Sequence, residues 1–260
     1  MQFDFGKNWD EFSSHALDGA KVAEAKEYFE LLTEGIDLKG KSFLDIGFGQ
    51  GLSLLIATEM GAITTGVDIN PTCTEVLKRN AGFYPDIDAD RIKVITGSIL
   101  EQNVIKKLDG GFNIVHSWGV LHHTGNMKQA IINAASLVKP EGYFIIAIYN
   151  THWTSPIWRF IKWAFNKSPR WLQKTMIGIF YPVIWLAKLM VTRKNPQTQE
   201  RGMDFFYDII DWLGGYPYEY ATVKEINIFM EGLKFKNIRT IPAEVPTGCN
   251  QFVFQKTGLR

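Results

Sequence analysis

Three glycines at alternating positions, Gly47, Gly49 and Gly51, are the residues that most directly indicate a ligand site. They follow an apolar run over 42–46 and precede a helical pattern of apolar residues that begins at Leu52. Glycine lets the backbone turn tightly and approach a ligand with no side chain in the way. The first turn of the following helix offers free N–H groups to whatever the turn holds. This strand, turn and helix predict a nucleotide-type site.

Two carboxylates narrow the choice of ligand. Asp45 lies just before the first glycine, where it would repel a pyrophosphate but suit a ligand with a positive charge. Asp68 ends the next predicted strand, and a carboxylate there can accept hydrogen bonds from both hydroxyls of a ribose. The glycine spacing also differs from the G-x-G-x-x-G pattern of dinucleotide sites, which disfavours a nicotinamide oxidoreductase. A ribose, a cationic end and no phosphate together match S-adenosylmethionine.

The elements that must position these residues alternate from residue 42 onward. Strands are expected over 42–46, 63–68, 92–96, 112–117 and 143–149, with helices between them over 51–60, 72–81, 100–108 and 127–138. This rhythm is typical of an α/β fold with a parallel sheet. A helix with a capping box between Thr222 and Glu225 follows later, and two closing strands over 235–241 and 250–256 are expected to pair as an antiparallel edge.

Composition fits one α/β core with an insertion. The chain has 260 residues, 46% of them hydrophobic and 21% charged, which indicates a sizeable core rather than disorder. The net charge of +1 decides nothing about a polyanionic partner. Two cysteines, Cys73 and Cys249, form no disulfide framework and no metal cluster. With no signal-peptide pattern at the N-terminus, we expect a cytoplasmic protein, or one peripheral to the inner membrane.

The alternation breaks over 152–201, where the composition shifts. This segment holds five of the eight tryptophans, and nine basic residues against one acidic residue. Its most apolar part, 176–191, contains Pro182 and Lys188 and falls short of the roughly 20 apolar residues that a membrane span needs. We expect a helical pair that caps the active site. A helical pair lying at a membrane surface is the alternative.

The N-terminal segment begins with aromatic residues and continues as a helix from about Asp18 to Leu32. It either packs across the sheet or folds back over the ligand as a flap. The expected organisation is then an N-terminal cap segment, a cofactor-binding core, a helical aromatic and basic insertion, and a final helix and strands that complete the sheet, over 1–40, 41–150, 151–220 and 221–260.

The stretch from 40 to 149 resembles the class I S-adenosylmethionine-dependent methyltransferases. FLDIGFGQG (43–51) is similar to the family's first motif and GVDIN (66–70) to its second; FNIVHSWGVLHHT (112–124) and LVKPEGYFIIAIYN (137–150) resemble its fourth and fifth strands. The flanking FDFGKNW, RGMDFFYDIIDWLGGYPYE and GCNQFVF resemble a bacterial subfamily with a helical insertion, often labelled by analogy to ubiquinone-pathway O-methyltransferases. The resemblance implies a Rossmann-like sheet of seven strands, mostly parallel with an antiparallel last strand.

The resemblance also implies which residues hold the cofactor. The glycine turn and Asp45 would surround its methionine end, Asp68 would hold the ribose, and Ile69 would lie against the adenine. Many members have an acid after the third strand, whereas this chain has Ser98 there, so adenine contacts would depend on backbone groups and Ile99. The full expected set is Asp45, Gly47, Phe48, Gly49, Gly51, Asp68, Ile69, Ser98, Ile99, Ser117 and Trp118.

Methyl transfer is an in-line displacement that needs an aligned nucleophile and a group to take its proton. His122 and His123 follow the fourth strand, whose C-terminal end borders the ligand site in an open α/β sheet. One of them is expected to be the general base, with Asp211 as the alternative; they could instead fix the loop by hydrogen bonds. No metal is expected, because no third ligand stands at helical spacing.

A second set of polar and aromatic residues is expected to meet the acceptor. Acids and tyrosines around Gly214 suit a sugar or an amine-bearing substrate, or else form a buried network that anchors the insertion. The residues assigned to the acceptor are Tyr149, Asn150, Tyr216, Tyr218, Glu219 and Asn250.

The leading hypothesis is therefore an S-adenosylmethionine-dependent O-methyltransferase of a small molecule, such as a saccharide, a cell-surface polysaccharide precursor or a natural product. A prenylated quinone-type or other lipid-like substrate, with peripheral membrane contact through 152–201, is the alternative. A cofactor-binding subunit without catalysis is a third reading. A nucleic-acid substrate is not expected, because no Asn-Pro-Pro-Tyr type motif follows the fourth strand. The oligomeric state is left open.

Overall fold

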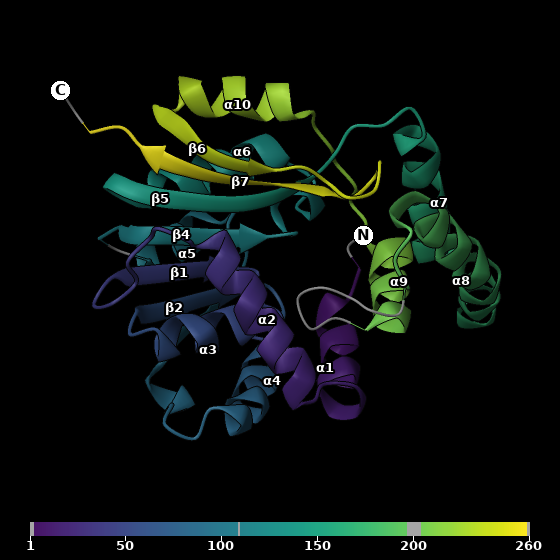
Figure 1. Cartoon of the computed structure of the whole chain (residues 1–260), viewed down its shortest axis with the longest axis horizontal. Coiled ribbons are helices and arrows are strands. Elements are labelled where there is room, and N and C mark those ends of the chain that lie inside the picture. The colour runs from purple at the N-terminus through teal and green to yellow at the C-terminus, as the bar shows by residue number, and fades with distance from the viewer. Residues whose placement is uncertain (1–2, 109, 197–203, 259–260) are drawn as a thin grey trace.

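The computed structural model describes residues 3–108, 110–196 and 204–258. Its centre is a seven-stranded sheet with the strand order β3-β2-β1-β4-β5-β7-β6 (Figure 1). The strands are β1 (Ser42–Ile46), β2 (Ile63–Asp68), β3 (Lys93–Thr96), β4 (Phe112–Trp118), β5 (Val138–Tyr149), β6 (Phe235–Ile241) and β7 (Cys249–Lys256). The first five strands pair in parallel, and β7 lies antiparallel to both β5 and β6. This confirms the fold expected from the sequence.

Helices cover both faces of the sheet. Residues of β1 alternate between two cores, because successive side chains of a strand point to opposite faces. Phe43 packs with α2 (Gly19–Leu32), α3 (Leu52–Glu59) and α4 (Thr72–Asn80), whereas Leu44 belongs to the core under α5 (Gln102–Lys107), α6 (Met127–Ser136) and α10 (Val223–Gly232). Three short 3-10 turns, η1 (Ala81–Phe83), η2 (Ala89–Arg91) and η3 (Leu121–His123), complete the described part of the core.

Strand β5 begins earlier than the sequence pattern indicated. The helix expected over 127–138 and the strand expected over 143–149 leave Pro140 and Gly142 between them, but α6 ends at Ser136 and β5 already begins at Val138. The pairing with β4 shifts register between Phe112 and Ile114, which accommodates these residues as an irregularity within the strand.

A helix not expected from the sequence, α1 (Phe5–His15), precedes α2 and packs against α4 and α9 (Phe205–Gly214). The amide of Asn80 on α4 donates a hydrogen bond to Ser13 Oγ on α1. Asn70, in the loop after β2, donates to the carboxylate of Asp4 at 2.7 Å. The N-terminal segment is thus held over the C-terminal ends of β1 and β2, while α2 packs across the sheet. That α1 acts as a flap over a ligand stays a prediction.

The insertion forms α7 (Ser155–Lys167) and α8 (Arg170–Thr192), which lie with α9 beside the carboxyl ends of the parallel strands (Figure 1). These three helices have a small core of their own, built on Phe165, Phe205, Ile209 and Leu213. No residue of α8 is buried. The helix extends for 23 residues, and within the described residues it alone is long and apolar enough to cross a membrane by length and composition. The sequence estimate of its apolar length was therefore too short, because the helix starts at Arg170.

Candidate active site

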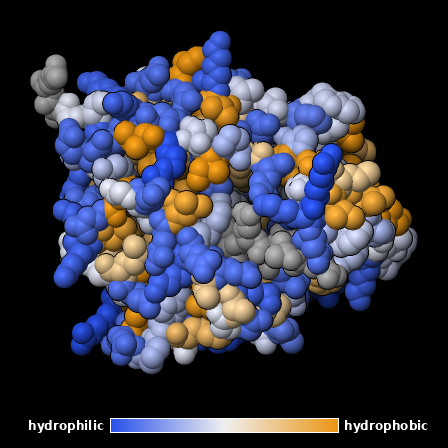
Figure 2. Space-filling view, viewed as in Figure 1, coloured by the Kyte–Doolittle hydropathy of each residue, from blue (hydrophilic) through white to orange (hydrophobic). Residues whose placement is uncertain are grey.

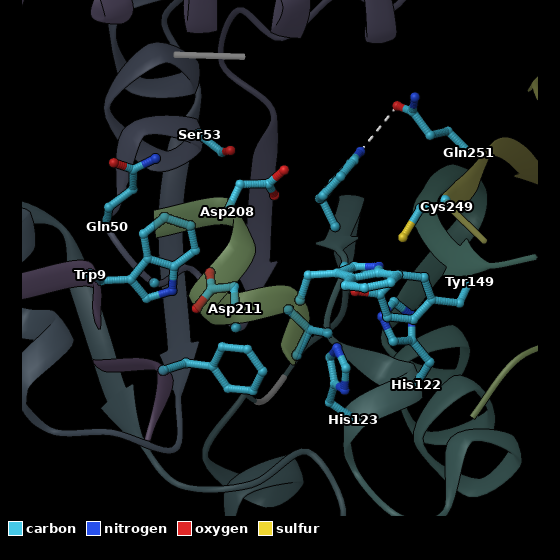
Figure 3. A pocket seen from close by; sticks show the side chains of 18 of the residues that line it. Trp9, Gln50, Ser53, His122, His123, Tyr149, Asp208, Asp211, Cys249 and Gln251 are labelled. Carbon is cyan, nitrogen blue, oxygen red and sulfur yellow. Dashed lines mark hydrogen bonds between the residues drawn. The ribbon is translucent and has the colours of Figure 1, made fainter. Parts of the chain in front are cut away.

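One cavity of about 810 Å³ runs from the glycine turn after β1 to the inner side of α8. Its walls come from the carboxyl ends of β1, β2, β4 and β5 and from α1, α2, α8 and α9. Figure 3 shows Trp9 and Gln50 on one side of it, His122 and Tyr149 on the other, and Asp211 between them. The size is that of a small-molecule site.

The glycine turn forms the floor of the cavity at the end of β1. Gly47 has φ +73° and Gly49 has φ +53°, backbone conformations that side-chain-bearing residues rarely adopt. A Cβ added at Gly49 would lie 2.8 Å from Nε1 of Trp9, which packs down on the turn from α1. Gly51, also expected at the cofactor, does not line the cavity; it caps the N-terminus of α3.

Asp68 stands at the end of β2 with both carboxylate oxygens held by backbone N–H groups. Oδ2 accepts from Gly49 at 3.0 Å and Oδ1 from Asn70 at 2.8 Å. Burial is the largest influence on this carboxyl and raises its pKa, while the two backbone hydrogen bonds act in the opposite direction. A carboxylate oxygen can accept more than one hydrogen bond, so Asp68 keeps acceptor capacity toward the cavity that it lines.

Asp45 also lines the cavity, but it has a partner that sequence reasoning missed. Its Oδ1 accepts a hydrogen bond of 2.8 Å from Nδ1 of His116, and both side chains are buried. The two residues lie opposite each other in the register of β1 and β4. A polar residue in the fourth strand of FNIVHSW was a visible signal, yet only strand pairing links it to Asp45. The carboxylate is thus positioned by His116 as well as by its own strand.

The remaining cofactor candidates fall into two groups. Ile69, Ser98, Ile99, Trp118 and Phe48 line the cavity. Ser117 does not: it is fully buried and its hydroxyl donates to the carbonyl of Ile46 at 2.9 Å. Trp118 donates from Nε1 to Oε1 of Gln251 on β7, another lining residue that was not singled out from the sequence.

The two histidines differ in their surroundings. His123 donates from Nδ1 to the carbonyl of Pro217 at 2.6 Å, which leaves Nε2 as the basic atom of the neutral ring. Neither ring nitrogen of His122 makes a hydrogen bond of normal geometry within the described residues. The backbone of Ala147 lies close to the ring and raises its pKa slightly, against the larger effect of burial. Burial lowers the pKa of His122 well below its usual value and that of His123 to about 3. Both rings are therefore neutral at physiological pH.

Asp211 lies on α9 and is tied to the N-terminal segment. Its carboxylate accepts a hydrogen bond of 2.7 Å from the amide of Asn8, which also donates to the carbonyl of Tyr207. Burial raises the pKa of Asp211 well above its usual value, and the nearby carboxyl of Asp208 raises it further. Both acids line the cavity. A carboxyl with a raised pKa is suited to proton transfer near neutral pH.

Five of the six predicted acceptor contacts do not line the cavity; only Tyr149 does. Asn150 and Asn250 pair with each other, Nδ2 of Asn250 donating to Oδ1 of Asn150 at 3.0 Å, and so join the ends of β5 and β7. Glu219 accepts from the backbone N–H of Met127, and the carbonyl of Tyr216 accepts from the N–H of Phe3. Tyr218 is buried against Tyr149. These residues support the wall rather than form its surface.

Lys162 of α7 is a further buried residue that the sequence did not single out. Its side chain is fully buried, and its Nζ donates to the carbonyl of Trp212 and lies over the rings of Tyr149, Trp212 and Tyr218. Burial lowers the pKa of this lysine to about 7. Lys162 thereby joins the insertion to the end of β5.

Within the described part of the chain, no group of three or more His, Cys, Asp and Glu side chains is arranged to hold a metal.

The site fits S-adenosylmethionine on the chain's own geometry. Gly47 admits no side chain, since a Cβ there would lie 2.5 Å from Val120, and its backbone lines the cavity directly. Asp68 retains acceptor capacity for ribose hydroxyls, and Asp45 places a carboxylate at the turn. Fold and site together match those of the class I S-adenosylmethionine-dependent methyltransferases.

Comparison with known proteins gives the family. The family described as "Methyltransferase domain" matches residues 20–180, which is more than half of the chain, and the chain belongs to it. The chain is 27% identical over 141 residues to "Ubiquinone biosynthesis O-methyltransferase" of Coxiella burnetii, covering 54% of this chain and 57% of that protein. The mitochondrial protein of that name from Schizosaccharomyces pombe is 28% identical over 142 residues, covering 54% of this chain and 49% of that protein. The chain thus spans about half the length of the curated relatives it matches.

Solved structures show the same fold. An O-methyltransferase family protein from Burkholderia thailandensis superposes with a TM-score of 0.59 at 13% identity, covering 97% of this chain and 60% of that one. Magnesium protoporphyrin IX methyltransferase from Synechocystis, solved with S-adenosylhomocysteine bound, gives 0.55 at 14% identity, with 91% and 83% covered. At these identities the likeness concerns the fold alone.

Proposed function

We propose that this protein is an O-methyltransferase that methylates a hydroxyl of an apolar, lipid-like acceptor of the prenylated-phenol or quinone-precursor type. The observation that carries this proposal is the continuous cavity between the glycine turn and an apolar wall. That wall is formed by α8 and α9, and its side chains include Val183, Ile184, Ala187, Val191, Phe205, Ile209 and Trp212. The names of the similar O-methyltransferases support the same class of acceptor.

In this proposal the turn at Gly47 and Gly49, Asp45 and Asp68 hold S-adenosylmethionine, with Ile69 and Ile99 beside the adenine. The bound cofactor supplies an electrophilic methyl group. Trp9 and Asn8 close α1 over the turn and exclude water. Apolar side chains of α8 and α9 hold the hydrophobic part of the acceptor, so that its hydroxyl is directed toward the glycine turn.

His123 is the proposed base; burial makes its neutral ring a weak base, so the transfer depends on Nε2 lying directly against the acceptor hydroxyl. Its Nδ1–H is fixed on the carbonyl of Pro217, so Nε2 is the atom that accepts the proton of the acceptor hydroxyl. The cofactor would supply the methyl group to the acceptor oxygen, and Nε2 of His123 would take the proton that this hydroxyl loses. Asp211 lines the same cavity and can take this proton instead.

A saccharide acceptor remains the second candidate because two acids, Asp208 and Asp211, line the cavity and carboxylates bind hydroxyl groups well. One oxygen of Asp211 is already engaged by Asn8, which reduces the polar surface available to a sugar.

The deciding experiment offers the protein S-adenosylmethionine with a panel of alkylated catechols and a panel of sugars and measures S-adenosylhomocysteine release. We expect turnover with the catechols that increases with alkyl chain length. Turnover with the sugars alone would replace the proposal by the saccharide reading. Calorimetric binding of S-adenosylmethionine with no product from either panel or from a lipid extract would favour a subunit without catalysis.

A further inference from the structure

The outer surface of the insertion carries an apolar stripe. Ile179, Val183, Leu186 and Met190 are spaced by four, three and four residues along α8, so they share one face of the helix. Together with Trp171 these side chains are between 51% and 69% exposed. A helix on a protein surface normally turns polar residues outward, so packing among the described residues does not explain this stripe.

The opposite face of α8 is already in use. Phe180, Tyr181, Ile184 and Trp185 pack against the small core formed with α7 and α9. Lys188 lies over the ring of Phe205 on α9. The helix is therefore held along one side by the protein and is apolar along the other.

Helix α7 extends the same kind of surface. Ile157 and Phe160, one turn apart, are 53% and 65% exposed, and Trp153 stands exposed just before the helix. Figure 2 shows apolar residues gathered at the side of the molecule where α7 and α8 lie. We name the exposed apolar residues of this surface the insertion face: Trp153, Ile157, Phe160, Trp163, Trp171, Ile179, Val183, Leu186, Met190 and Val191.

Basic residues border the insertion face. Arg159, Lys167, Arg170, Lys174 and Arg193 are exposed on α7, on α8 and at their ends. The sequence from 152 to 196 contains no acidic residue. Tryptophan beside lysine and arginine is the composition of helices that lie in the plane of a bilayer, where the rings reach the acyl boundary and the cations meet anionic headgroups.

The cavity opens at this face. Val183 and Val191 are both more than half exposed and also line the cavity. A water-insoluble acceptor could therefore pass from an adjoining bilayer between these side chains without crossing water.

We infer that the insertion face binds the surface of an anionic phospholipid bilayer, with α8 lying in the plane of the membrane. This inference rests on the proposed function in one respect only: an acceptor dissolved in a membrane needs such a contact. A spanning orientation is not favoured, because one side of α8 packs on α7 and α9 and Lys174 and Lys188 interrupt its apolar length.

The test is co-sedimentation of the full chain with phosphatidylcholine vesicles, with and without phosphatidylglycerol. We expect binding to the anionic vesicles that weakens with salt. In the variant Ile179→Gln/Leu186→Gln/Met190→Gln, the partition coefficient for anionic vesicles should fall by at least roughly tenfold. Its control is Ile228→Gln on α10, which removes an isoleucine as exposed as Ile179 from a helix that packs on one face of the sheet, away from α7 and α8, and should bind like the original chain. None of these four residues lines the cavity.

A second measurement keeps the inference falsifiable if the triple variant folds poorly. Brominated phospholipid should quench the tryptophan fluorescence of the chain, and Trp171→Phe should reduce that quenching. Three results would overturn the inference: no binding to either vesicle; equal loss in the triple variant and the control; or a dimer without lipid that the triple variant dissolves, which would assign the face to a second copy. Resistance to alkaline carbonate extraction would overturn the surface orientation.

Methyl transfer to a water-soluble catechol separates this inference from the proposed function. Activity without vesicle binding would refute the membrane contact alone. Vesicle binding without transfer to any hydroxyl acceptor would refute the proposed function alone.

Discussion

The carboxylate of Asp45 and the imidazole of His116 form a buried pair, with 2.8 Å between Oδ1 and Nδ1, across the neighbouring strands β1 and β4. The ring of His116 is packed against Phe43 and Phe29, so it has little freedom to leave the carboxylate. The pair fixes an acid at the glycine turn. It joins the two strands whose ends form the centre of the cavity.

Replacing His116 by phenylalanine should destabilise the fold strongly. The ring shape is kept, but the carboxylate of Asp45 then stays buried without its partner, which costs about 3 kcal/mol or more. Urea unfolding measures the loss of unfolding free energy. The double variant Asp45→Asn/His116→Phe should recover part of it; if the two single changes simply add, the two residues are not coupled and the assignment fails.

Asp68→Asn should weaken binding of S-adenosylmethionine. The change removes a charged acceptor that the backbone N–H groups of Gly49 and Asn70 hold in place. Loss of one hydrogen bond to a charged group is worth about 1.5–3 kcal/mol, roughly a 10- to 100-fold rise in Kd by calorimetry. The control Asp37→Asn changes an exposed loop carboxylate that also accepts a backbone N–H. Unchanged affinity in Asp68→Asn would contradict the ribose assignment.

His123→Gln should lower kcat by roughly 10²–10⁴-fold with little change in cofactor affinity, because a glutamine cannot take a proton. His122→Gln should cost much less turnover, since no fixed hydrogen bond orients that ring. Steady-state kinetics with an alkylated catechol makes the comparison. If both variants retain near-normal kcat, Asp211→Asn becomes the variant that should lose it.

The two buried histidines should make the fold sensitive to acid. Burial holds the pKa of His123 at about 3, against 6.5 when unfolded, so below pH 6.5 the unfolded chain binds more protons than the folded one. Stability from this histidine is complete above pH 6.5 and is lost as the pH falls. The loss is about 2 kcal/mol between pH 7 and pH 5.

Urea unfolding at these two pH values measures that loss, and His123→Phe should reduce it irrespective of its effect at neutral pH. The lowered pKa of His122 adds a loss in the same direction. A difference between the two pH values that is the same in the original chain and in His123→Phe would show that this ring is not buried as a neutral group.

Much of the sheet was accessible from the sequence because its signals are local. The strands and helices from β1 to β5 repeat an apolar pattern, and the bounds of β1 and β2 agree with it. The glycines after β1 indicate a backbone with positive φ, which glycine adopts readily and other residues rarely do, and Gly47 has this conformation. Helix α1 was missed although Phe5, Trp9 and Phe12 have the four- and three-residue spacing of a helix, because Gly6 and Asn8 between them are weak helix formers.

The sequence by itself thus determined the class of fold, the glycine turn and the acids at the ends of β1 and β2. Only the tertiary structure decided that His116 serves Asp45, that Trp9 covers Gly49, and that Asn150 pairs with Asn250 instead of facing the cavity. Backbone preference and apolar period act between residues a few positions apart. Side-chain pairing across the sheet depends on which distant segments pack together, and the order of residues in one sequence does not reveal those contacts.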